Sequence, residues 1–210
     1  MEDSVVFVEV GGWSPAMVIL DAMEKTAGVR VLQAELNDQP GVCIKMHGPL
    51  GDARAAADAA EQIARQMQVA CVVDVIASPA SGSEAAFNPP PDYNVLFEQA
   101  TVHVPPPPAK RKERVKPVSM NSDFAVGLIE TQGFTAVFEA IDTALKTAAV
   151  EVLAREKLGG GYITVVIKGD VAAVAAAIDA AKAKVDGLGK LIAAHVIANP
   201  SPGVLSLLPK

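Results

Sequence analysis

The sequence predicts an α+β protein built from two tandem copies of one β-α-β-β-α-β unit. Three observations carry this prediction: an internal repeat, an alternation of strand-like and helix-like segments within each copy, and a Pro-rich segment between the copies. With a shift of 121 residues, residues 5–79 align with 126–200 without a gap, and about 21 of 75 positions are identical. A solenoid would show shorter periods and at least three copies. We therefore expect two copies of one domain.

The second copy shows the predicted elements most clearly. Residues 125–131 form a short apolar run of strand length, and the apolar residues of 134–145 recur with helical spacing. A glycine turn at 159–161 precedes a third strand, and Asp170 stands where a helix N-cap belongs. The predicted order is strand 125–131, helix 134–145, strand 150–153, strand 162–168, helix 171–185 and strand 191–198.

This order fits a ferredoxin-like α/β sandwich, in which the helices cover one face of the sheet. The helix at 171–185 is rich in alanine, so we expect it to approach the sheet, or another subunit, closely. Between the copies, proline runs and the basic stretch 110–116 predict an extended tether. Within it, Tyr93 to Val104 remains a candidate for a short helix or strand packed on the first domain. We divide the chain into domain one (1–80), a linker (81–123) and domain two (124–210).

Composition excludes several classes of protein. The chain has 24 acidic and 18 basic residues and a net charge of −6, which argues against a general nucleic-acid-binding protein. No apolar run has the roughly 20 residues of a membrane helix, and the N-terminus lacks the features of a signal peptide. Two cysteines are too few for a disulfide scaffold, so we expect a cytoplasmic protein.

Several long motifs in domain two carry a specific resemblance. They are GLIET (127–131), EKLGGGYITVVIKGD (156–170) and HVIANP (195–200). With these motifs in this order, the second copy resembles a bacterial microcompartment shell domain, and the first copy has the same frame. The whole chain therefore resembles the tandem-domain shell proteins, in the non-permuted form. The resemblance implies a homotrimeric pseudohexamer that tiles with other shell proteins, has no catalytic activity, and lets small metabolites cross a central pore.

The resemblance also places the pore. The family's pore loop corresponds to Gly159, Gly160 and Gly161 in copy two. In copy one, the shift of 121 residues assigns it to Asp38, Gln39 and Pro40. The narrowest point would then alternate three Gln39 amides with three Gly160 backbones, which favours small polar or anionic metabolites; the Asp38 carboxylates would reverse that preference if they point inward. The alternative is a plain tight turn that uses Gly and Pro for their backbone angles.

Edge contacts are implied at the end of the first helix of each copy. Lys25 and Lys146 share the context KTA and match the family's edge lysine, although a solvated lysine at a helix C-terminus is the simpler alternative. Where the family often has Arg before the last proline, this chain has Ser78 and Asn199, which predicts weaker or more selective edge contacts.

The residues predict neither a cofactor nor a metal. Some tandem shell proteins hold an iron–sulfur cluster on a cysteine of the pore loop, but Gln39 stands at that position here. Cys43 and Cys71 are interpreted as core residues; the alternative for Cys43 is that the thiols of three chains together act as ligands. The three histidines have no metal-ligand spacing. No catalytic triad signature is present. The alternative to a shell protein is a small-molecule-sensing regulator with tandem ferredoxin-like domains, which has no reason to contain the long 156–170 motif.

Overall fold

The computed structural model describes residues 4–36, 41–80, 93–94, 99–105 and 124–208. Domain one has the predicted order of elements: β1 (Ser4–Val10), α1 (Trp13–Thr26), β2 (Arg30–Leu36), β3 (Val42–Gly48), α2 (Leu50–Met67) and β4 (Cys71–Ile76). Domain two repeats it: β8 (Ala125–Gln132), α4 (Phe134–Thr147), β9 (Val150–Gly159), β10 (Tyr162–Gly169), α5 (Val171–Lys182) and β11 (Lys190–Ala198). A short helix, α6 (Pro202–Leu207), follows.

Each domain contains one antiparallel sheet. The strand orders are β4-β1-β3-β2 and β11-β8-β10-β9, which are the same order in the two copies. The α+β class and the tandem ferredoxin-like β-α-β-β-α-β order predicted from the sequence are confirmed. The second strand of copy two is longer than expected, because its ladder with β10 continues to Gly159.

Part of the segment between the copies belongs to the first sheet. β7 (Val102–His103) pairs with β2 and is the fifth strand of the first sheet. β5 (Tyr93–Asn94) and β6 (Gln99–Ala100) form a separate two-stranded ribbon. Val102 is buried. The candidate strand within Tyr93 to Val104 is therefore present, and this end of the segment is packed against domain one.

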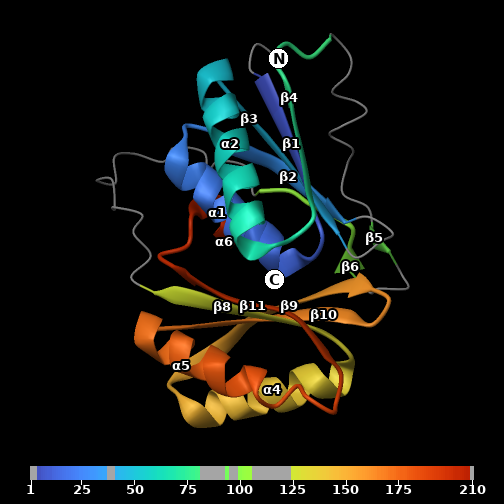
Figure 1. Cartoon of the computed structure of the whole chain (residues 1–210), viewed down its shortest axis with the longest axis vertical. Helices are drawn as coiled ribbons and strands as arrows, with labels where there is room; N and C mark the ends of the chain where they lie inside the picture. Colours follow the sequence, from blue (N-terminus) through green and yellow to red (C-terminus); the bar gives the residue numbers. More distant parts are fainter. Residues whose placement is uncertain (1–3, 37–40, 81–92, 95–98, 106–123, 209–210) are drawn as a thin grey trace, which may run out of the picture.

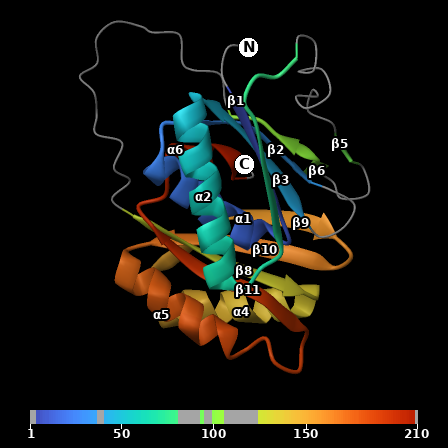
Figure 2. The same cartoon turned by 45° about the horizontal axis from the view of Figure 1, so that its top comes forward.

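The two domains stack with α1 between their sheets (Figure 1). α4 and α5 cover one face of the domain-two sheet, and α1 contacts β8 and β11 on the opposite face. Figure 2 shows the same layering from a second direction. One hydrophobic core therefore combines α1 and the first sheet with Val126, Leu128 and Val166 of the second sheet. The first helix of domain one is buried on both sides.

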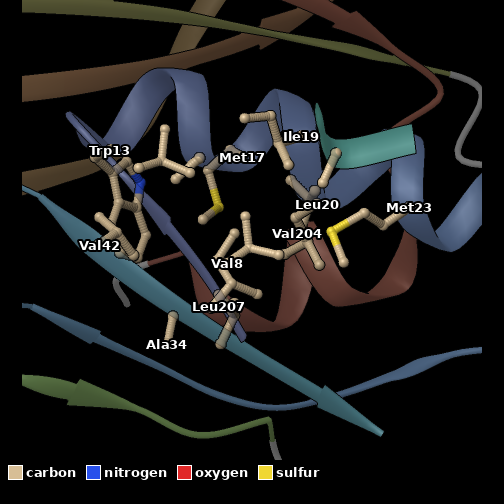
Figure 3. Packing of buried hydrophobic residues seen from close by; sticks show 14 of the residues in the cluster. Val8, Trp13, Met17, Ile19, Leu20, Met23, Ala34, Val42, Val204 and Leu207 are labelled. Carbon is tan, nitrogen blue, oxygen red and sulfur yellow. The ribbon is translucent and has the colours of Figure 1, made fainter. Parts of the chain in front are cut away.

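α6 completes this shared core. Val204 and Leu207 are buried: Val204 lies beside Leu20 and Met23 of α1, and Leu207 lies close to Val8 of the first sheet (Figure 3). The C-terminal helix thus belongs to domain two in sequence, but it packs on α1 and β2 of domain one.

The alanine-rich helix α5 lies very close to its sheet, as expected. A Cβ atom on Gly127 would come within 2.9 Å of Val174 and Ile178, and Ala177 and Ala181 are fully buried. The helix begins at Val171 after Asp170, as predicted, but the Asp170 side chain makes no capping hydrogen bond.

Candidate functional site

The predicted pore loop of copy two is a tight hairpin between β9 and β10. Gly160 and Gly161 both have positive φ, 58° and 82°, which a two-residue primed turn needs. The amide of Gln132 donates to Gly160 O at 3.2 Å, and Gly133 N donates to Gly161 O at 2.9 Å. Gly160 is exposed at the tip. A fixed, bare backbone at this tip suits a loop that presents peptide groups to a small solute.

The matching loop of copy one lies between β2 and β3. Asp38, Gln39 and Pro40 fall outside the described residues. The ends of β2 and β3 that flank them are paired through Leu36 and Val42, as the hairpin of copy two requires. The role of both loops in a pore stays a prediction.

The edge lysines have the same local partner in both copies. Lys25 Nζ lies 2.7 Å from Asp21 Oδ2, and Lys146 Nζ lies 2.5 Å from Asp142 Oδ2. The hydrogen bond with Asp142 raises the pKa of Lys146. Lys25 also donates to Ala198 O at 3.1 Å, so it links α1 to the end of β11. The structure therefore gives Lys25 a contact between the domains.

Asn199 lies next to the carbonyl that Lys25 contacts. It has a positive φ of 50°, it is exposed, and its N–H donates to Phe124 O at 3.1 Å. Ser78, its counterpart in copy one, is exposed in the bend that follows β4. The structure thus brings Lys25 and Asn199 together at the boundary between domains.

A glutamate that the sequence analysis did not single out lies at the centre of this boundary. Glu130 of β8 is fully buried, and its two carboxylate oxygens accept from the N–H groups of Trp13 and Ser14, at 3.2 and 3.0 Å. These are the first residues of α1, so domain two supplies the N-terminal cap of a domain-one helix. Burial raises the pKa of Glu130 to about 7, although the two backbone donors act in the opposite direction.

Gly12 permits this contact. It precedes α1 with φ of 101°, and a Cβ atom there would lie 2.9 Å from Glu130 Oε2. The signal in the sequence was the repeat itself: Glu9 and Gly12 are identical to Glu130 and Gly133. The alignment marked these positions, but a strand pattern does not show that a second domain covers one face.

A second set of polar side chains lies near the indole ring of Trp13. His103 of β7 packs on Trp13 with ring centroids 5.0 Å apart, and its Nε2 lies 3.5 Å from Oε2 of the fully buried Glu156 on β9. Glu156 faces Thr164 across the ladder, and Thr164 faces Glu130. Within the described part of the chain, the Glu156 oxygens, Thr164 Oγ1 and Trp13 Nε1 have no hydrogen-bond partner. Ordered water satisfies such groups in protein interiors.

The cysteines do not form a metal site with other described residues. No group of three or more His, Cys, Asp or Glu residues in the described ranges could hold a metal ion. Cys71 is partly buried and packs against the core. The core assignment of Cys43 is wrong, because it is half-buried on the opposite face of β3, between Glu9 and Glu35 on the neighbouring strands. Burial raises the pKa of both thiols.

Comparison with known proteins agrees with the repeated fold. The family pattern described as "BMC domain" matches residues 4–79 and 125–200. The bacterial microcompartment shell protein PduA of Citrobacter freundii is 45% identical over 86 residues, which are 41% of this chain and 92% of PduA. The chain belongs to the family of bacterial microcompartment shell proteins. The resemblance seen in the motifs is thus confirmed.

Other members of the family match in the same way. The carboxysome shell protein CcmK2 of Thermosynechococcus vestitus is 46% identical over 89 residues, 40% of this chain and 85% of CcmK2. These shell proteins have about the length of one domain of the present chain, which carries two. A solved microcompartment protein of Desulfitobacterium hafniense covers 96% of this chain, with 97% of its own length, at 22% identity and a TM-score of 0.38. Of the helices in the described residues, none is long and apolar enough to span a membrane.

Proposed function

We propose that this member of the microcompartment shell family forms a ring of three chains and six domains that tiles the shell of a bacterial microcompartment. Its role is structural, as the family membership indicates, and metabolites cross the shell at the centre of the ring. The observation that carries the proposal is the packing of α1 on the bare face of the domain-two sheet.

That contact joins two different surfaces of one repeated domain: a first helix and the helix-free face of a sheet. Such a head-to-tail contact leaves one copy of each surface unused at the two ends of the chain. A further chain can therefore add in the same way. The ring of our proposal closes if each contact turns the next domain by one-sixth of a turn; any other rotation gives an open filament. A chain with two domains supplies the six positions two at a time.

The hairpins carry the pore part of the proposal. Around the ring, the β9–β10 hairpin with Gly160 would alternate with the β2–β3 loop that contains Gln39. Peptide groups and amides at the constriction favour small polar or anionic solutes over apolar ones, because selectivity follows the groups that line a pore. Asp38 would set the sign of the charge near the opening.

Contacts with other shell proteins belong to the rim of the ring. Lys146 is mostly exposed at the end of α4, and Ser78 is exposed at the end of β4. Together with Lys25 and Asn199, these residues are our candidates for the contacts between neighbouring rings. Ser and Asn at the position before the last proline provide fewer donors than Arg, so partner choice is narrower.

Native mass in solution tests the ring directly. Three chains of 21.7 kDa give about 65 kDa, and twice that value indicates two rings stacked face to face. Flat sheets in electron micrographs would support tiling. A chain that stays monomeric or dimeric at tens of micromolar overturns the proposed ring and its pore.

A further inference from the structure

The interface between the two domains, which we call the joint, contains three sets of contacts. Residues at the equivalent positions of the repeat lie on the outer surfaces of the chain. The first part is Glu130, whose carboxylate receives the N–H groups at the start of α1. The first N–H groups of a helix have no partner within the helix and carry a partial positive charge, so they favour a carboxylate, although burial acts against the charge of Glu130.

The counterparts of these residues in the other domain lie on the outer surface of the chain. Glu9 of β1 occupies the position of Glu130, pairs across the ladder with Cys43 as Glu130 pairs with Thr164, and its side chain is exposed. Gly133 precedes α4 with φ of 120°, as Gly12 precedes α1 with φ of 101°. In the described chain no side chain caps α4, and its first turn contains no acid.

A stripe along each first helix forms the second part. In α1 it consists of Met17, Asp21 and Glu24: Met17 is fully buried, Asp21 Oδ1 accepts from Ser201 N at 2.8 Å, and Glu24 Oε2 accepts from Gly203 N at 2.7 Å. The matching stripe of α4 is exposed. It consists of Phe138, Asp142 and Leu145. Phe138 and Leu145 are large apolar side chains that are 54% and 44% exposed.

The lysine contact is the third part. Lys25 reaches Ala198 O from the end of α1. Lys146 is in the same position on α4, and the counterpart of Ala198 in copy one is Ala77, exposed at the end of β4. The outer surfaces thus repeat a glutamate, a helix start and a lysine with its carbonyl. The exposed stripe of α4 keeps the acid as Asp142 and is more apolar than that of α1, because Leu145 replaces Glu24.

We propose that Glu9 of one chain caps the N-terminus of α4 in a second copy of the chain, and that this carboxylate fixes which surfaces meet when the ring closes. Domain one of a second chain therefore covers the exposed surface of α4. The inference rests on the proposed ring and adds the residues that make its three joints between chains. The helix start alone would not carry it; the decisive observation is that the equivalent glutamate already binds the equivalent helix start within the chain.

A charge exchange between Glu9 and Thr135 tests the proposal. Thr135 is exposed in the first turn of α4, at the position that Ser14 holds in α1. Glu9→Lys places a cation against the helix start, and Thr135→Glu places a second acid beside Glu9. Each weakens a joint about tenfold by our estimate, so the concentration for half-assembly rises about 30-fold when three joints are affected. The double variant E9K/T135E joins opposite charges and regains much of the assembly.

Sedimentation of the full chain against concentration provides the measurement. Glu61→Lys is the matched control, because Glu61 is an exposed acid on α2 and its change leaves assembly unaltered. Thermal unfolding of each variant confirms that the chain still folds. If the wild type assembles while E9K assembles equally well, or if the exchange regains nothing, the role of Glu9 is overturned and the ring stands. If the wild type itself stays monomeric, the ring fails first.

Discussion

The two first helices, α1 and α4, come from one ancestral repeat unit but lie in different surroundings. Met17 of α1 is fully buried, whereas its counterpart Phe138 of α4 is 54% exposed. α1 has a sheet on each side, because domain two covers it, and α4 has only its own sheet. The difference shows that burial within one chain follows from position in the tandem, and that an exposed apolar stripe marks a surface whose counterpart is already covered.

The largest expected effect comes from placing the same charge on both stripes. Met17→Glu buries a carboxylate among apolar side chains and lowers the free energy of unfolding by at least about 4 kcal/mol. Phe138→Glu changes the free energy of unfolding of the unassembled chain by less than about 0.5 kcal/mol. Its main effect is to reduce assembly. Urea unfolding and native mass measure the two effects. Equal destabilisation by both substitutions would contradict the comparison.

Next in size is the pH dependence that Glu130 gives to the joint inside the chain. Its pKa is raised from 4.5 to about 7, so the folded chain holds a proton that the unfolded chain releases above pH 4.5. The contribution of Glu130 to stability is therefore greatest below pH 4.5 and falls as pH rises toward 7, by about 3 kcal/mol in this window. Unfolding of wild type and Glu130→Gln, compared from pH 4.5 to 8, isolates this loss.

Glu9→Gln is the matched control for that experiment, because Glu9 is the exposed counterpart of Glu130. At chain concentrations too low for assembly, it leaves the slope of stability against pH as in the wild type. If E130Q retains the wild-type slope, Glu130 is not the origin of the pH dependence.

A smaller effect is expected where the second helix of each domain, α2 or α5, packs on its sheet. Gly127 lets α5 approach β8 closely, whereas the matching position on β1 is the buried Val6. Gly127→Ala pushes a methyl group into Val174 and Ile178 and lowers stability by about 1–3 kcal/mol. Gly51→Ala, at an exposed position of α2, is the control, since no atom lies within 4 Å of the added methyl group. A gain in stability with G127A would mean that α5 moves away freely.

The smallest expected effect on the fold accompanies a change at the predicted pore. Gln39→Trp leaves the unfolding transition of the chain within about 0.5 kcal/mol of wild type. In an assembled shell it narrows the opening at three of its six positions and slows the flux of small polar metabolites. Solute entry into purified shells measures this. Unchanged flux would show that the β2–β3 loop does not line the passage.

The fold was predictable from the sequence because local signals agreed with the repeat. Positive-φ glycines mark the hairpin at 160–161, and the order of elements in the clearer copy could be transferred by a constant shift. The core assignment of Cys43 failed although period-2 alternation was available: Val42 and Ile44 face the helices, so residue 43 faces the other way.

The joint between the domains could not be predicted in the same way. Glu130 lies in a strand whose other face is apolar, and only the packing of a second domain turns it into a helix cap. His103 lies outside both matched domains, and nothing in the composition of the linker indicates that it contacts Trp13. Contacts between parts of the chain that are distant in sequence leave no periodic signal.

The hydrogen bond between Asp21 and Ser201 joins residues 180 positions apart. During synthesis, α1 is made long before the segment that covers Met17. This face of α1 therefore stays uncovered until about 180 more residues have been added. Domain one therefore cannot complete its packing until the chain through α6 has been made, and shorter chains expose a surface that favours aggregation. A chain that stops before α6 lacks Val204 and Leu207 and leaves the core around α1 incomplete.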